Sequence, residues 1–218
     1  NMKQVALLDN FCWGNPDKPD RLGGLVRCAQ GCYNAAMAYG TPFISGKDSL
    51  YNEFASGKGK ETIAIPGTIL ISAIGIIDEV HKCLTMDFKK AGNLIYVVGD
   101  TLPELGGSIY YENHNYVGNV VPQVNFKKAL KIFNSLSATV KACLVRSIHD
   151  CSEGGLGVAF AEMAFSGGFG VTVRLDHVPV KGKIDRNDLV LFSESHSRFI
   201  VEVEPSKQVR FEKSFNGL

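Results

Sequence analysis

Apolar positions in the first part of the chain follow two spacings, which predict a strand, a helix and a second strand. A short apolar run predicts a strand at 3–8. Apolar residues three and four positions apart then predict a helix that Gly40 ends as a C-cap, and a further run predicts a strand at 41–44. This order is typical of a parallel crossover, so we expect the ends of the two strands to lie side by side. The inward face of the helix is expected to hold Leu22, Leu25, Val26, Ala29, Tyr33, Ala36 and Met37.

The longest apolar stretch, 62–77, is broken at Pro66 and Gly67, and its β-branched residues predict a strand buried on both faces. Charged residues become frequent between 78 and 92, so we expect a domain boundary there. The chain would then divide into a first domain at 1–80 and a second domain at 81–218.

The second domain is predicted to mix helices and strands, which makes the whole chain α/β (α+β). Asn125 is expected to cap a helix, a second helix is expected at 156–166, and 100–119 is expected to be a loop. Strands are predicted at 94–98, 145–148, 171–175 and 199–203. The inward face of the first helix is expected to hold Leu130, Phe133, Leu136, Val140 and Leu144.

Polar residues gather at 45–53, immediately after the second predicted strand. Gly46 would let backbone N–H groups approach an anion, and Lys47 supplies a positive charge. Asp48 and Glu53 carry the hard oxygen ligands that Mg²⁺ takes together with phosphate oxygens. A phosphate or metal–phosphate site is one interpretation, and a polar turn is the other.

A nucleotide-binding P-loop is excluded by the spacing in this stretch. That motif needs a glycine five positions before the Gly-Lys pair and a serine or threonine after it. Thr41 and Asp48 stand at those two positions, and 54–60 is typical of a flexible loop, not of a helix. Any phosphate held here is therefore bound by another architecture.

Polar residues also follow two other predicted strands. Asp9 and Asn10 are expected to end the first strand before a loop at 11–16, which is a usual place for ligand contacts in α/β proteins. Asp150 follows another strand, and the glycines at 154–155 would leave free N–H donors at the start of a helix. Asp150 is a candidate metal ligand.

Two alternatives remain open around that second cluster. Ser152 is a candidate cap for the helix, and His149 is expected to be a hydrogen-bonded structural residue, not a catalyst. Residues 193–198 are interpreted either as a substrate-holding segment or as a polar turn.

Composition limits the partners of this 218-residue chain. Its formal net charge of +1 argues against a nucleic-acid-binding face, and no apolar run is long enough to predict a membrane span. No signal peptide is visible, and the six cysteines form no C-x-x-C pair. We therefore expect a cytoplasmic protein with reduced thiols, in which Cys28 and Cys32 share one helix face as small core residues.

Several motifs, in order along nearly the whole chain, resemble the large, synthetase subunit of phosphoribosylformylglycinamidine synthase. This family belongs with aminoimidazole ribonucleotide (AIR) synthetase. The motifs are LDNFCWGNP at 8–16, PFISGKDSLYNE at 42–53, ELGGS at 104–108, HDCSEGGL at 149–156, AEMAF at 161–165 and SES at 193–195 before Arg198 and Phe199.

The resemblance implies a subunit made of two fused copies of an A domain and a B domain. Residues 1–80 would be the end of the second, ATP-binding A domain, and 81–218 most of the second B domain. The implied reaction is the ATP-dependent conversion of formylglycinamide ribonucleotide and ammonia to formylglycinamidine ribonucleotide in purine biosynthesis. The implied partners are a glutaminase subunit, a small accessory subunit and the missing N-terminal half of the same chain.

The resemblance also implies roles for residues. Asp9 and Gly46 match ATP-contacting positions, and Ser49 matches a substrate-contacting position. Many relatives carry an asparagine ligand for Mg²⁺ where this chain has Lys47, and a protonated lysine cannot ligate a metal. Metal binding would then pass to Asp48, with Lys47 on the phosphate.

Asp150 matches a metal position in an auxiliary nucleotide site. The family's catalytic histidine lies in the missing copy, so no catalytic residue is expected in this chain, which should be inactive alone. Two alternatives are a non-catalytic structural half with an auxiliary nucleotide site, and a sister enzyme such as AIR synthetase.

Overall fold

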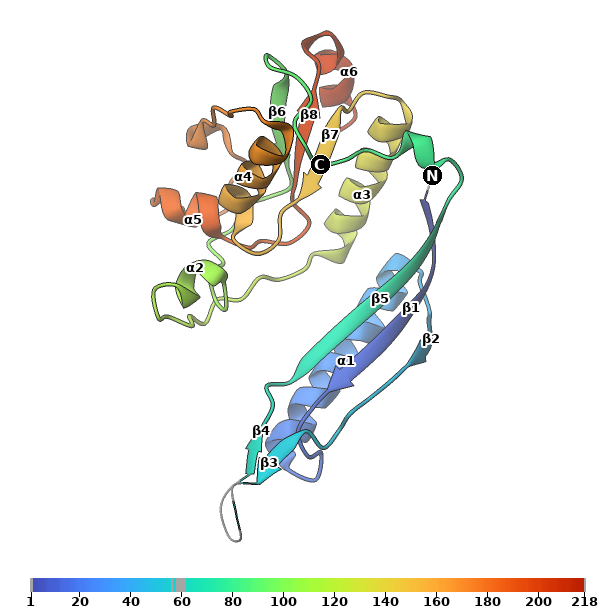
Figure 1. The fold of residues 1–218 in the computed structure, drawn as a ribbon, viewed down its shortest axis with the longest axis vertical. Helices are drawn as coiled ribbons and strands as arrows, with labels where there is room; N and C mark the ends of the chain where they lie inside the picture. The colour runs from blue at the N-terminus through green and yellow to red at the C-terminus, as the bar shows by residue number, and fades with distance from the viewer. Residues whose placement is uncertain (1, 56, 58–61, 218) are drawn as a thin grey trace. The chain divides into compact units, whose positions relative to one another are not determined.

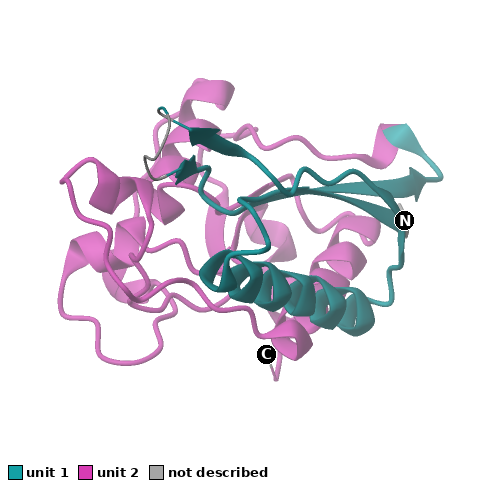
Figure 2. Cartoon of the chain, turned by 90° about the horizontal axis from the view of Figure 1, so that it is seen from below, with its two compact units in different colours: residues 1–80 teal, residues 81–218 magenta. Residues whose placement is uncertain are grey.

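The computed structural model describes residues 2–55, 57 and 62–217, which divide into two compact units. The first unit is Asn1–Val80 and the second is His81–Leu218 (Figure 2). A 3₁₀ turn, η1 (Val80–Lys82), spans the junction. The assignment of these units to domains of the resembled enzyme stays a prediction.

The first unit is a sheet with one long helix beside it (Figure 1). In its described part the sheet has the order β2-β1-β5, with β1 (Met2–Cys12) in the centre. β2 (Phe43–Gly46) pairs with β1 in parallel, and β5 (Thr68–Ile77) pairs with it antiparallel. α1 (Pro19–Tyr39) connects β1 to β2 and lies along one face of the sheet. The predicted parallel crossover is therefore confirmed.

The predicted end of the first strand is wrong. β1 continues through Asp9 and Asn10 to Cys12, where a loop had been expected. Asn10 pairs with Leu70 of β5, and Cys12 pairs with Thr68. Because β5 takes up the backbone groups of these residues, their polar side chains do not end the strand.

The boundaries of α1 agree with the prediction from the sequence, but the exposure of its apolar side chains does not. Pro19 opens α1, and Gly40 closes it with φ 66° and an N–H bond to the Ala36 carbonyl, as predicted. Several side chains expected to point inward are instead exposed, Val26 by 59% and Met37 by 66%.

The strand predicted from the apolar run at 62–77 also differs in burial. β5 begins after the Pro-Gly break as expected, but it is the last described strand at one edge of its sheet. Leu70, Ile74 and Ile76 are 61%, 48% and 58% exposed, so the predicted burial on both faces is wrong for this chain.

Two short strands form a separate antiparallel pair. β3 (Glu53–Ala55) pairs with β4 (Thr62–Ala64). The loop predicted at 54–60 is therefore wrong at its first two residues, and residues 56 and 58–60 lie outside the described part of the chain.

The second unit has helices on both faces of an antiparallel sheet. In the described residues the sheet order is β6-β8-β7, so the last strand in the chain lies in the centre. Its strands are β6 (Leu94–Val98), β7 (Ser147–Asp150) and β8 (Phe199–Val203). Its helices are α2 (Ile109–Glu112), α3 (Phe126–Lys141), α4 (Gly155–Gly167), α5 (Asn187–Phe192) and α6 (Gln208–Lys213), with 3₁₀ turns η2 (Leu175–His177) and η3 (Pro205–Lys207).

Alternate residues of β8 divide the core of this unit into two clusters. Ile200 packs into a cluster with Leu156 and Met163 of α4. Val201 packs into the other cluster, which contains Leu136 of α3. Because neighbouring residues of a strand point to opposite faces, α4 and α3 cover opposite faces of the sheet (Figure 1). The predicted α/β class is confirmed.

Four expectations in this unit need correction. The strand predicted at 145–148 is displaced to Ser147–Asp150, so Asp150 ends β7 and does not follow it. Residues 171–174 form no strand, and the chain enters η2 (Leu175–His177) instead. The loop predicted at 100–119 contains α2, which Ser108 caps through the Tyr111 N–H. Asn125 caps α3 as predicted, yet the buried face of that helix is displaced from the predicted one. It holds Ala129, Ile132, Leu136 and Thr139.

Candidate functional site

The segment after β2 continues along β1 and forms no glycine turn. The N–H of Lys47 donates to the Asp9 carbonyl at 3.0 Å, and the N–H of Ser49 donates to the Phe11 carbonyl at 2.8 Å. Trp13 returns a 2.8 Å bond to the Ser49 carbonyl. The candidate phosphate-binding stretch is therefore an extended edge segment, paired in register with β1.

Gly46 provides space for a side chain of the neighbouring strand. Gly46 is the register partner of Asp9, so the predicted proximity of these two residues is confirmed. A Cβ atom at position 46 would lie 2.3 Å from Oδ1 of Asp9. An anion approaching the Gly46 backbone on this face would meet the Asp9 carboxylate, which disfavours a phosphate there. ATP contact by these two residues stays a prediction.

Lys47 and Ser49 lie on the opposite face of the strand pair from Asp9. The ammonium of Lys47 donates to the Ser49 hydroxyl, and Ser49 is the register partner of Cys12. Side chains alternate along β1, so Cys12 and Asp9 point to different faces. The face of Asp9 is the one covered by α1, because Trp13 on that face donates its indole N–H to the Arg21 carbonyl at 2.8 Å.

The face that carries Lys47, Ser49 and Cys12 is called the open face below. Asn10 also lies there, since the Cys12 thiol donates to the Asn10 side-chain oxygen at 3.6 Å. Thr68 of β5 completes the row, as the register partner of Cys12. The open face thus presents an ammonium group beside hydroxyl, amide and thiol groups, which are donors suited to a phosphate.

Asp48 is partly used by the protein itself. Its Oδ1 accepts the Phe11 N–H at 3.1 Å, and so takes the place of a backbone carbonyl in the ladder. The side chain is exposed, so its other oxygen is accessible. Within the described residues no group of three or more His, Cys, Asp or Glu side chains comes together to hold a metal ion. Within that part of the chain, Asp48 is therefore offered without further carboxylates that would complete a Mg²⁺ site.

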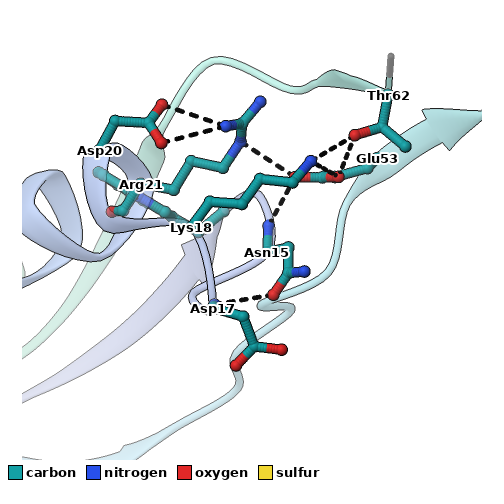
Figure 3. Close-up of polar contacts among 8 residues, drawn as sticks. Asn15, Asp17, Lys18, Asp20, Arg21, Glu53 and Thr62 are labelled. Atoms are coloured by element: carbon teal, nitrogen blue, oxygen red, sulfur yellow. Dashed lines mark hydrogen bonds and ion pairs between the residues drawn. The ribbon is translucent and has the colours of Figure 1, made fainter. Parts of the chain in front are cut away.

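Glu53 is not available as a metal ligand. Its side chain is only 2% exposed, and both carboxylate oxygens accept hydrogen bonds from the protein (Figure 3). Bonds from Lys18, Thr62 and the Asn15 N–H lower the pKa of this carboxyl to about 2. The suggestion that Glu53 offers oxygen to Mg²⁺ is therefore wrong.

The second polar cluster is less open than the sequence suggests. The N–H of Gly154 donates to Oε1 of Glu194 at 2.9 Å and that of Gly155 to the Ser152 carbonyl at 3.0 Å, so the two glycine donors expected to be free are in use. Ser152 does not cap the helix; its hydroxyl donates to Asp150 at 3.0 Å. The Asp150 side chain is 64% exposed, and its role as a metal ligand stays a prediction. His149 pairs with Glu162 at 2.8 Å, as expected of a structural histidine.

The polar residues at 193–198 form hydrogen bonds that connect segments of the second unit. Glu194 also accepts the Ile109 N–H at 3.0 Å, so one carboxylate joins the starts of α2 and α4. Arg198 is buried and donates to the Thr101 hydroxyl at 2.9 Å and to the Ser195 carbonyl at 3.1 Å. Burial lowers the pKa of its guanidinium. The sequence shows Arg198 directly before the apolar strand β8, but it does not indicate that this side chain is buried.

The fold and these motifs define a member of the AIR synthetase-related class. Residues 90–217 match the family described as AIR synthase related protein, C-terminal domain, and the chain belongs to this family. Among the described residues, no helix combines the length and apolar character needed to cross a membrane.

The particular relatives agree with the resemblance seen in the motifs. The chain is 34% identical over 214 residues to the phosphoribosylformylglycinamidine synthase subunit PurL of Thermococcus sibiricus, covering 98% of this chain and 29% of that protein. The fold is similar to Thermotoga maritima PurL complexed with FGAR, with a TM-score of 0.71, 17% identity and coverage of 98% and 33%. For T. maritima PurL complexed with ATP the values are 0.65, 19%, 98% and 31%. The chain thus spans about a third or less of these relatives.

Proposed function

We propose that the chain is part of an ATP-dependent carbon–nitrogen ligase that converts formylglycinamide ribonucleotide and ammonia to formylglycinamidine ribonucleotide. The observation that carries this proposal is the 34% identity to a PurL subunit, which extends over 98% of the chain. The fold relatives from T. maritima are described as complexed with ATP and with FGAR, which supports the same two ligands here.

On this proposal the open face holds phosphate. The ammonium of Lys47 and the hydroxyl of Ser49 already contact each other, and together they offer charge and a hydrogen-bond donor to one phosphoryl group. Asn10 and Cys12 lie beside them and would border the same ligand. We propose Lys47 as the ATP-phosphate contact and Ser49 as a substrate contact.

The proposed reaction has two steps. The substrate amide oxygen takes the terminal phosphoryl group of ATP and releases ADP; ammonia then forms the new carbon–nitrogen bond and phosphate leaves. Fixed positive charge near the transferring phosphoryl group would lower the barrier. Mg²⁺, when bound, would neutralise phosphate charge. The described residues offer Asp48 and Asp150 as one candidate ligand each.

The proposed division of labour places the remaining contacts outside this chain. The first unit would be the C-terminal part of an ATP-binding A domain, and the second unit a B domain. A glutaminase subunit would supply ammonia, with a small accessory subunit and the N-terminal half of the same protein as further partners. The six free cysteines are in keeping with a cytoplasmic location.

The test is ADP release measured with ATP, formylglycinamide ribonucleotide and ammonium. The full-length protein is expected to turn over, and the 218-residue chain alone is expected to show none. In the full-length protein, Lys47→Met should raise the KM for ATP about tenfold or more, because it removes a charge-assisted phosphate contact. Full-length protein that never releases ADP under these conditions would refute the proposal.

A second candidate is a structural half whose nucleotide contacts are not catalytic. Two observations favour it: the Asp9 carboxylate lies over Gly46, and Glu194 accepts the Gly154 N–H at the start of α4. On this alternative, Lys47→Met would leave kcat and KM unchanged. Adding nucleotide would raise the unfolding temperature of the variant by less than that of the wild type.

A further inference from the structure

We infer that Glu53 is a positioning residue that holds Lys47 and Ser49 at the proposed phosphate site. The inference rests on the proposed function. Glu53 ends the segment that carries both residues, and its carboxylate is buried in the first unit. Figure 3 shows its contacts. It touches none of the groups offered to the ligand, so its effect would be exerted through the backbone.

One carboxylate connects three parts of the first unit. Its Oε1 accepts the Asn15 N–H at 2.9 Å, in the loop after β1. Its Oε2 accepts the Lys18 ammonium at 2.7 Å, before α1, and the Thr62 hydroxyl at 2.6 Å, at the start of β4. Arg21 in the first turn of α1 places its Nε 3.0 Å from Oε1. Glu53 thereby fixes its own backbone to the loop after β1, to α1 and to β4 together.

The charge balance makes this connection sensitive to the carboxylate. Two cations, Lys18 and Arg21, surround the anion, and their side chains are 35% and 23% exposed. Removing the negative charge leaves two partly buried cations without their shared partner, which is more costly than losing a surface ion pair.

The segment between β2 and Glu53 depends on this attachment. In the described sheet β2 is an edge strand, so the segment is bonded on one side, to β1. Its N-terminal end is held by the Asp9–Gly46 pairing, and its C-terminal end by the Asn52 N–H bond to the Trp13 carbonyl at 2.9 Å. Glu53 follows directly and secures that end, four positions after Ser49.

Two measurements test the inference. In the full-length protein, Glu53→Gln keeps the shape but removes the charge, and should raise the KM for ATP about tenfold while kcat changes less than about threefold. In the chain itself, the same variant should speed hydrogen exchange at the Ser49 and Asn52 amides about tenfold, with the β1–β5 amides unchanged.

The matched control is Asp20→Asn. Asp20 pairs with Arg21 from the outside of the cluster, at 3.1 Å, and its side chain is 75% exposed. Because it makes no contact with Glu53, its removal should change neither KM nor exchange. If Glu53→Gln fails to fold, Lys18→Met tests the same attachment from the other side.

The outcomes separate the inference from the function on which it rests. Full-length wild type without turnover would refute the proposed function, while the exchange measurement would still report on the attachment. Active wild type with an unchanged KM in Glu53→Gln would overturn the positioning role. Unchanged exchange at Ser49 and Asn52 would overturn the attachment itself.

Discussion

The Asp9 carboxylate lies over the Gly46 backbone in the candidate site. The absence of a side chain at position 46 is what allows Asp9 to extend over the neighbouring strand, since a Cβ would lie 2.3 Å from Oδ1. This contact assigns Gly46 a packing role that is independent of any ligand.

Gly46→Ala should therefore lower the free energy of unfolding by about 1–3 kcal/mol, as for other overpacked sites. The change is measured by urea denaturation. Asp9→Ala in the same chain should restore most of the loss, because it removes the colliding group. Gly31→Ala is the matched control: nothing lies within 4 Å of a Cβ there, and alanine favours the helix by about 0.5–1 kcal/mol. Equal losses in Gly46→Ala with and without Asp9 would contradict the explanation.

The ionisation of Glu53 makes the stability of the first unit depend on pH in the acid range. Its folded-state pKa of about 2 lies below the ordinary value of 4.5, so the ionised form stabilises the fold above pH 4.5. This contribution is lost as the pH falls from 4.5 toward 2. The urea midpoint of the wild type should exceed that of Glu53→Gln at neutral pH, and the difference should shrink across this window. A difference that is constant with pH would contradict the assignment.

At the scale of elements, helix ends and several strands could be predicted because local signals fix them. Gly40 and Asn125 cap helices where the sequence places them, and β6 and β8 have the predicted bounds. The far end of β1 could not be predicted, since its pairing with β5 decides it. The segment 171–174 has the composition of a strand but pairs with none in the described structure.

The same limit applies to the candidate site. The proximity of Asp9 and Gly46 follows from the strand–helix–strand order, which the sequence shows. The separation of Asp9 from Lys47 onto two faces depends on register, and a shift of one residue would reverse it. The use of Glu194 at two helix starts depends on partners 85 and 40 positions away, which no local pattern reveals.

Glu194 connects the starts of α2 and α4, so its removal should destabilise both helices. Glu194→Ala leaves the Ile109 and Gly154 amides without this acceptor, so the free energy of unfolding should fall by about 1–3 kcal/mol. Glu194→Gln keeps one acceptor oxygen and should lose less. Glu153→Gln, a neighbouring exposed carboxylate, is the control and should stay within about 0.5 kcal/mol in the same thermal denaturation series.

At the scale of the molecule, the first unit exposes much of its apolar surface. Leu70, Ile74 and Ile76 share the open face with Cys12, because they occupy alternate positions of β5. The open face is thus polar near Ser49 and apolar toward the end of β5. An exposed apolar surface of this kind favours association.

We therefore expect the isolated chain to form dimers or larger species, detected by light scattering after size exclusion. Ile76→Lys should shift it toward the monomer by placing a charge on the apolar part of the open face. Val209→Lys, at a site 78% exposed in the second unit, is the control and should leave the mass unchanged. A wild-type chain that is monomeric at all concentrations would contradict this expectation.

The central position of β8 has a consequence for how the second unit is made. β6 and β7 each pair with β8 and not with each other in the described sheet, although β8 is the last of the three in the chain. The buried Glu202 of β8 accepts the N–H groups of Lys89 and Lys90, more than a hundred residues earlier. While the ribosome is still translating the first half of this unit, the central strand β8 has not been made. β6 and β7 therefore have no strand to pair with in this sheet. We therefore expect the sheet of this unit to form late and cooperatively, after β8 has been translated.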